Sequence, residues 1–322
     1  MRLILLQRQP AFRLSCYELL LSHLSPSHPQ SPIILNEISL LLSGTYGEER
    51  VDQAMLPFST KAFLAFQNAL FPFAGETVQI DHLFLTPCFA LVIETKHIKG
   101  HLFLDPENEQ MHRIKNGTIQ CFTHPVLQLE RQVEGLEFLF TELQLSLPIF
   151  KMVVFTHSDV FLESAGANRR LPPEICRIER LTSRVRKLLR ENTQEVYSES
   201  ELLQKARLLR HHIVQEKLYD VMKKFKIDKK ELLGGVWCKN CRRLSMKWIS
   251  LKWHCTICNS RNRHAHKRSF EAYFRFISPT ITNREARNFL KIDSPDTARR
   301  LLLTMNLKTK GNCRSRRYLS PF

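Results

Sequence analysis

The chain has 322 residues, 43% of them hydrophobic, which excludes a disordered or fibrous protein and allows two or three domains with their own cores. Its net charge of +17 is concentrated at one end, because residues 223–322 hold 25 Lys and Arg against 6 Asp and Glu, whereas residues 1–222 hold 23 against 25. No stretch approaches the roughly 18 uninterrupted apolar residues of a membrane span, and no cleavage site follows the first apolar run, so we expect a cytoplasmic protein that does not enter a membrane.

The first segment, residues 1–35, is expected to be a helical leader followed by a linker. Gln7 and Arg8 interrupt the apolar run that begins with LILL, and SPSHPQSP at 25–32 is rich in residues that end regular structure. Residues 36–190 then alternate helix, strands, helix, strand and helix. This order predicts a mixed α/β domain, a sheet flanked by helices.

Within this domain, QIDHLFLTPCFALVIETKHIKG at 79–100 predicts a hairpin that carries charged residues on strands suited to a core. Because strand side chains alternate, Glu94 and Lys96 share a face, and Asp81 can reach the same point from the first strand. The same alternation predicts one face made of Val78, Ile80, His82 and Phe84. Two carboxylates beside an ammonium suit a Mg²⁺ ion and an attacking water, as in phosphodiester hydrolysis. The alternative is a surface Glu–Lys ion pair, which is common and contributes little.

Helices on either side of the hairpin supply two further candidates. In GTYGEERVDQAML, Glu48 recurs at helical spacing with Val51 and Met55, so it is expected to face inward while Glu49 points elsewhere. In HPVLQLERQVEGLEFLF, Gln128 lies on a stripe beside the expected core side of a helix. That core side consists of Val126, Leu129, Val133, Leu136 and Phe140.

These motifs, in this order, resemble the nuclease-related domain (NERD), a branch of the PD-(D/E)xK nuclease superfamily. The motifs are Gly47-Glu48, Gln79-Ile80-Asp81-His82, Ile93-Glu94-Thr95-Lys96 with Gly100, and Pro125 with Gln128. The resemblance covers roughly residues 40–155 and implies a restriction-endonuclease-like mixed sheet. It implies that Asp81 and Glu94 bind Mg²⁺ or Mn²⁺, that Lys96 serves the water, that Glu48 adds a carboxylate, and that Gln128 is a positioning residue. The Trp that family members often carry after the hairpin is missing from DPENEQMHRIKNG at 105–117.

Residues 191–233 are helix-forming and predict a helical connector. They lead into a four-cysteine unit expected over residues 234–262. There Cys238, Cys241, Cys255 and Cys258 form two C-x2-C pairs separated by thirteen residues. This spacing predicts one structural Zn²⁺, because four thiolates leave no open coordination position. His254, His264 and His266 are the alternative ligands.

Residues 263–322 predict a small basic domain. Thr282 and Glu285 suit a capping box, and Ser294 with Pro295 suits the start of a second helix, so the pair resembles a helix-turn-helix. The tail KTKGNCRSRRYLSP is expected to form a wing or hairpin. Nucleic-acid contacts are expected from the cations of the last two units: Arg242, Arg243, Lys247, Arg299, Arg300, Arg314, Arg316 and Arg317. A generic helical hairpin with a solvated basic tail is the alternative.

Together these features predict a metal-dependent nuclease that binds nucleic acid, with DNA as the expected substrate. A catalytically inactive nucleic-acid-binding protein that keeps the nuclease fold is the alternative. A regulatory protein whose basic end recruits an acidic protein is a third interpretation, which weak salt dependence would favour. The sequence leaves open whether DNA or RNA is cut, whether ends or interiors are attacked, the number of ions, and the oligomeric state.

Overall fold

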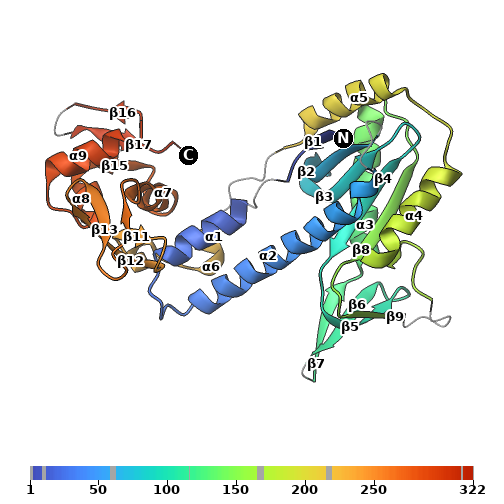
Figure 1. Ribbon diagram of the computed structural model, residues 1–322, viewed down its shortest axis with the longest axis horizontal. Helices are drawn as coiled ribbons and strands as arrows, with labels where there is room; N and C mark the ends of the chain where they lie inside the picture. Colours follow the sequence, from blue (N-terminus) through green and yellow to red (C-terminus); the bar gives the residue numbers. More distant parts are fainter. Residues whose placement is uncertain are drawn as a thin grey trace. The chain divides into compact units, whose positions relative to one another are not determined.

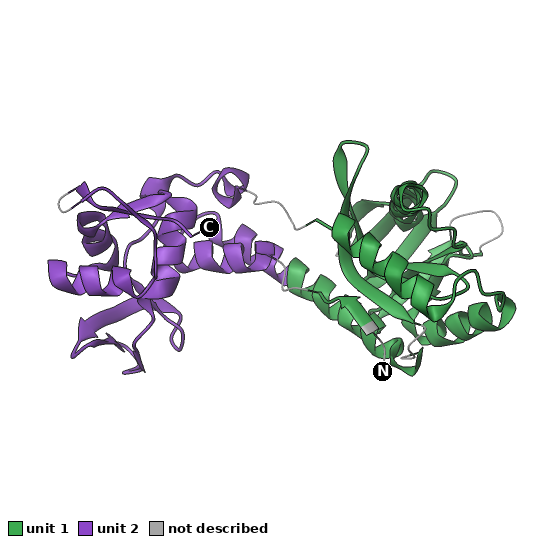
Figure 2. Cartoon of the chain, turned by 90° about the horizontal axis from the view of Figure 1, so that it is seen from above, with its two compact units in different colours: residues 1–9, 40–217 green, residues 10–39, 218–322 purple. Residues whose placement is uncertain are grey.

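A computed structural model of the chain describes residues 3–8, 12–58, 63–115, 117–164, 170–214, 220–312 and 315–321. The chain divides into two compact units, residues 1–9 with 40–217 and residues 10–39 with 218–322 (Figure 2). The boundary between residues 39 and 40 falls inside helix α2 (Ser31–Ala54). The boundaries of these units differ from those of the five segments expected from the sequence. The expected leader, residues 1–35, and the expected connector, residues 191–233, each contribute residues to both units.

The first unit is built on a six-stranded mixed sheet in the order β1-β2-β3-β4-β8-β10, of which Figure 1 labels β1, β2, β3, β4 and β8. Strand β3 is antiparallel to both of its neighbours, β2 and β4, whereas β1, β8 and β10 run parallel to the strands that they join. The bounds are β1 Leu3–Leu6, β2 Leu64–Phe73, β3 Glu76–Leu85, β4 Ala90–Lys96, β8 Ile149–Phe155 and β10 Ile175–Arg177. The mixed α/β class predicted from the sequence is confirmed. Leu3–Leu6 is a strand, not part of a helical leader, because it finds a parallel partner in β2.

Helices cover both faces of this sheet and enclose one core on each side. On one face α3 (Pro125–Glu142) and α5 (Glu199–His212) pack on a core centred on β2, β3 and β4. On the other face α4 (Ile178–Glu191) and the C-terminal part of α2 pack on a second core, next to the short helix η1 (Leu56–Phe58). The core side predicted for α3 is confirmed, since Leu129, Leu136 and Phe140 are buried.

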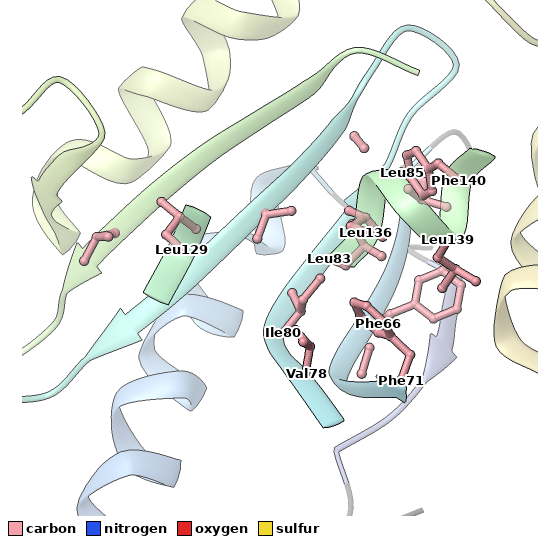
Figure 3. Close-up of a cluster of buried hydrophobic side chains, with 14 of the residues drawn as sticks. Phe66, Phe71, Val78, Ile80, Leu83, Leu85, Leu129, Leu136, Leu139 and Phe140 are labelled. Atoms are coloured by element: carbon pink, nitrogen blue, oxygen red, sulfur yellow. The ribbon is translucent and has the colours of Figure 1, made fainter. Parts of the chain in front are cut away.

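Strand β3 changes faces at Asp81. On β2, Asn68 has a positive φ of 53°, and the β2–β3 ladder skips the Asn68–Asp81 position. Irregularities of this kind re-aim the side chains around them. Val78 and Ile80 consequently pack in the core covered by α3 (Figure 3), whereas Phe84 packs in the core on the other side. The prediction that Val78, Ile80 and Phe84 share one face is therefore wrong.

A second, four-stranded sheet in the order β7-β6-β5-β9 extends the first unit. Its bounds are β5 Gly100–Asp105, β6 Gln110–Lys115, β7 Thr118–Thr123 and β9 Val160–Ser164. Leu102, Leu104, Met111 and Val160 join the core on the α3 side. The sheet therefore shares the hydrophobic core of the main sheet.

The second unit combines small sheets with short helices, several of which enclose one core. Its helices are α1 Phe12–Ser22, α6 Val221–Phe225, η2 Lys229–Glu231, α7 His266–Phe276, α8 Asn283–Leu290 and α9 Pro295–Leu303. Its strands are β11 Val236–Cys238, β12 Arg243–Ile249, β13 Lys252–Cys255 and β14 Arg261–Asn262 in one sheet, and β15 Thr280–Thr282, β17 Arg317–Leu319 and β16 Thr309–Lys310 in another. Trp253 is fully buried in this core, and its indole Nε1 donates to His266 Nδ1 over 3.1 Å. In the described ranges, no helix has both the length and the apolar character needed to cross a membrane.

Candidate active site and metal centre

Glu94 is buried, with 2% of its surface exposed. Both of its carboxylate oxygens accept hydrogen bonds: Lys96 Nζ donates to Oε1 over 2.7 Å, and Gln132 Nε2 donates to Oε2 over 2.6 Å. Lys96 Nζ also donates to Gln128 Oε1 over 2.7 Å. Buried charges require partners of this kind. The fold therefore brings Glu94, Lys96 and Gln128 together, and it adds Gln132, which lies one helical turn after Gln128 on α3.

Asp81 approaches the same place from β3, just beyond the last ladder pair of β3 and β4. Its Oδ2 accepts the backbone N–H of Thr95 over 2.9 Å. Burial raises the pKa of Asp81 well above its ordinary value, and the negative charges of Glu94 and Glu48 raise it further. The Thr95 N–H and the charge of Lys96 act in the opposite direction. The carboxyl groups of Asp81, Glu94 and Glu48 therefore influence one another.

This donor set fits a hard divalent cation. Carboxylate oxygens are the protein ligands that such ions prefer, and a cation would offset the repulsion that raises the pKa of Asp81. Among the described residues, one group of at least three His, Cys, Asp or Glu side chains could hold a metal ion, with ligand atoms within 4.8 Å of one another. That group consists of the four cysteines of the second unit. Glu48, Asp81 and Glu94 thus do not form a preformed triplet. One or two carboxylates completed by water is the arrangement that Mg²⁺ usually takes.

Glu48 lies on α2, close enough for its charge to act on Asp81, and it pairs with an arginine near the start of the chain. Arg8 Nε lies 2.5 Å from Glu48 Oε2, and Arg8 Nη1 lies 2.7 Å from Asp52 Oδ2. Burial works against ionisation of Asp52, but His82 and Arg8 outweigh it and lower the pKa of Asp52 to about 2. The inward orientation predicted for Glu48 is confirmed, since Val51 beside it is fully buried. Sequence reasoning missed Arg8, and the signal available was a cation two residues after a short apolar strand.

A glycine allows α2 to lie close to the residues that follow β4 and β8. A Cβ at Gly47 would lie 2.6 Å from His97 Cβ and 2.9 Å from Thr156 Oγ1. His97 Nδ1 and Thr156 Oγ1 are 2.8 Å apart and are hydrogen-bonded to each other, so neither can easily move aside. The close approach of the helix to the ends of β4 and β8 therefore requires glycine at 47.

The four cysteines of the second unit form a compact sulfur cluster. The Sγ atoms of Cys238, Cys241, Cys255 and Cys258 all lie within 4.8 Å of one another. The closest pairs are Cys238 with Cys258 at 3.6 Å and Cys241 with Cys255 at 3.5 Å, close to the roughly 3.8 Å expected around a tetrahedral ion with 2.3 Å bonds. The hairpin of β12 and β13 joins the two pairs. The cluster could bind a metal such as zinc, and none of the three alternative histidines belongs to it.

Local hydrogen bonds prepare one of these thiols for ligation. Burial works against ionisation of Cys255, but the Ser245 hydroxyl and the backbone N–H groups of Cys258 and Ile257 outweigh it and lower its pKa to about 6. For Cys241 the Ser245 hydroxyl favours the thiolate, yet burial and the neighbouring sulfurs raise its pKa to about 11. Thiolates packed this closely repel one another, and a divalent ion would relieve that repulsion.

The predicted nucleic-acid contacts are distributed over three elements of the second unit. Arg242, Arg243 and Lys247 are exposed at or beside β12, and Arg299 and Arg300 are exposed on α9. Arg317 is exposed on β17, and Arg316 just before it is half-buried. Arg314 lies outside the described residues. The capping box of Thr282 with Glu285 and the Ser294 cap are confirmed.

Comparison with known proteins agrees with the geometry of the first unit. Residues 43–156 match the family model described as the nuclease-related domain. The match begins in α2 before Glu48 and ends at Thr156, directly after β8, so it includes the hairpin and all of α3. No curated protein and no solved structure matches the chain.

Proposed function

We propose that this chain, whose residues 43–156 form a nuclease-related domain, is a metal-dependent nuclease that hydrolyses phosphodiester bonds of nucleic acid, with DNA as its substrate. The observation that carries the proposal is the convergence of Asp81, Glu94 and Lys96, with Glu48 and Gln128 beside them. A Glu–Lys ion pair on a solvated surface would not explain a glutamate that is 2% exposed.

Each of these side chains has a role in the proposed reaction. Asp81 and Glu94 would hold Mg²⁺ or Mn²⁺, which supplies a Lewis acid for the phosphoryl oxygen and a nucleophilic water at neutral pH. Lys96, fixed between Glu94 and Gln128, would orient the water and offset the negative charge that grows on the phosphate. Water adds to phosphorus, the bond from phosphorus to the leaving sugar oxygen breaks, and that oxygen takes up a proton.

Glu48 and Gln132 complete the site as supporting groups. Glu48 adds a third negative charge near Asp81, and Arg8 restrains it. Gln132 holds the Glu94 oxygen that Lys96 does not contact. Carboxylates fixed in this way keep the geometry that an ion and a substrate phosphate require.

The second unit would deliver the nuclease to its substrate. Its excess of Lys and Arg favours a polyanion. Helices α8 and α9, joined by residues 291–294, would form the helix-turn-helix with Arg299 and Arg300 toward the nucleic acid, and β16 and β17 would form the wing. The four cysteines would hold one structural Zn²⁺, with all coordination positions filled. Thiolate ligands persist in a reducing compartment, so we place the protein in the cytoplasm.

A cleavage assay tests this function. Purified protein is incubated with single- and double-stranded DNA and with RNA, with either Mg²⁺ or Mn²⁺. Cutting should be lost in Asp81→Ala and Lys96→Ala proteins, whereas Lys99→Ala, which removes a cation that is 68% exposed, should cut normally. DNA binding should persist in all three variants and weaken steeply with salt.

The second candidate is a nucleic-acid-binding protein without catalysis. Both oxygens of Glu94 are engaged by Lys96 and Gln132, and this favours a carboxylate that is structural. Salt-sensitive DNA binding without cutting by the wild-type protein, over all substrates and both metals, would establish this alternative in place of the nuclease.

A further inference from the structure

The second unit contains a pocket of about 370 Å³ between the cysteine-bearing strands and the start of α7. Ten residues line it, and four of them are Lys239, Arg261, His264 and Arg268. Lys239 belongs to the loop between the first two cysteines, and Arg261 follows the last cysteine by three residues. The walls of the pocket are therefore set by the same turns that hold the sulfur cluster.

The charge of this pocket is positive and is not neutralised by the protein. No Asp or Glu lines it, and between Gly234 and Phe270 the sequence has nine Lys and Arg and no acidic residue. Within the described part of the chain, none of its four basic side chains makes an ion pair. Arg268 Nε is buried and has no hydrogen-bond partner. Buried donors are normally satisfied, so the Nε–H of Arg268 lacks an acceptor that an anion could supply.

The N-terminus of helix α7, beside the pocket, also favours an anion. Helix α7 has 11 residues and opens at the pocket, and its N-cap residue, Ala265, makes no side-chain capping bond. The N-terminus of a helix carries partial positive charge and favours anions. Asn262 accepts the backbone N–H of His264 over 2.6 Å, which ties the loop in front of the helix to the pocket wall.

One wall is aromatic. Trp237, which is half-buried, lines the pocket. An aromatic face beside a cationic cluster matches a nucleotide, because the base can stack on the ring while the phosphate meets the cations. The volume lies within the roughly 300–1,000 Å³ typical of small-ligand sites. A pocket of this size fits one nucleotide better than a continuous strand.

We propose that this pocket binds a nucleotide through a terminal phosphate, with Arg268 and Arg261 on the phosphate and Trp237 on the base. A phosphate monoester carries up to two negative charges, whereas a phosphodiester in the strand carries one, so the clustered cations favour a strand end or a free nucleotide. This inference deepens the proposed function, on whose nucleic-acid substrate it rests. In that setting the pocket would anchor a phosphorylated end of the strand while the first unit cuts.

The test uses full-length Asp81→Ala protein, so that the probe is not cut, loaded with zinc and without added Mg²⁺. Fluorescence anisotropy measures binding of a short single-stranded DNA oligonucleotide with a 5′-phosphate, a 3′-phosphate or neither, labelled at the other end. Adenosine monophosphate and adenosine are compared as competitors, which separates a free nucleotide from a strand end. We expect one terminal phosphate to tighten binding by about tenfold, the effect of one strong charge-assisted contact.

The preference should disappear in a protein with Arg261→Gln and Arg268→Gln. A protein with Lys252→Gln and Lys267→Gln has the same net charge and keeps the pocket, so it should retain the preference. Zinc content and tryptophan emission check that both variants are folded. Equal binding of all oligonucleotides by the parent protein, or equal losses in the two variants, would overturn the pocket assignment. Cutting by the wild-type protein is measured separately, so failure of the pocket and failure of the nuclease are distinguishable.

Discussion

Arg8 is expected to contribute more to the stability of the first unit than any exposed ion pair there. Its side chain is 10% exposed and pairs with Glu48 and Asp52, whose side chains are 15% and 19% exposed. Replacing Arg8 by Met keeps most of its apolar volume but removes the cation from two partly buried carboxylates, of which Asp52 keeps His82 and Gln67 as partners. Removing one partner of a buried ion pair costs about 3–5 kcal/mol. For a unit of this size that cost corresponds to roughly 6–20 °C in melting temperature.

The chain offers a direct assay for this effect. All three tryptophans, Trp237, Trp248 and Trp253, lie in the second unit, so tryptophan fluorescence follows that unit alone, whereas far-ultraviolet circular dichroism follows both. In urea, Arg8→Met should shift the dichroism transition of the first unit and leave the fluorescence transition in place. Adding Glu48→Gln should recover part of the loss, because one unpaired charge is then removed.

Arg131→Met provides the matched control. Arg131 pairs with Glu76, and their side chains are 54% and 66% exposed. Exposed pairs contribute about 0–1 kcal/mol, so this change should have little effect on either transition. If Arg8→Met destabilises the protein no more than Arg131→Met, then Arg8 does not hold Glu48 and Asp52 as we describe.

Three further predictions follow from the same geometry. Because the folded-state pKa of Asp81 is raised, the stabilisation from its protonation is lost as pH rises through that value. Metal-free Asp81→Asn protein should therefore have a free energy of unfolding larger than that of wild type near pH 7.5, by on the order of 1 kcal/mol, and the difference should close toward about pH 4. A difference that stays constant across this range would contradict the repulsion that we infer. In urea denaturation, Gly47→Ala should destabilise the first unit by about 1–3 kcal/mol through overpacking. Gly44→Ala in the same helix, where nothing lies within 4 Å of an added Cβ, should instead stabilise the unit by about 0.5–1 kcal/mol. Similar effects at both positions would argue against a close approach of the helix at Gly47. Metal chelation, or Cys255→Ser, should abolish stoichiometric metal and shift tryptophan emission to the red, because Trp253 is 0% exposed in the intact unit. Metal-free protein with unshifted emission would show that the cysteine cluster does not support this core.

The sequence alone determined the features that depend on short separations along the chain. Two C-x2-C pairs form a cluster because each pair turns the backbone locally and a hairpin joins them. Glu94 and Lys96 lie on one side of β4 because strand side chains alternate, and α3 buries the predicted stripe because helical periodicity repeats every 3.6 residues. The capping box of Thr282 and Glu285 likewise needs only three residues of context.

Tertiary structure alone decided the features that join distant segments. Nothing near Arg8 in the sequence indicates that it pairs with Glu48 and Asp52. The contact forms only when β1 pairs with β2 and α2 packs on the face of the sheet that α4 also covers. The change of faces at Asp81 arises from Asn68 on the neighbouring strand, and a single-strand pattern cannot contain it. Local hydrogen bonding and side-chain periodicity are properties of a short peptide, whereas burial and charge pairing are properties of the assembled core, and the chemistry of this site depends on the second kind.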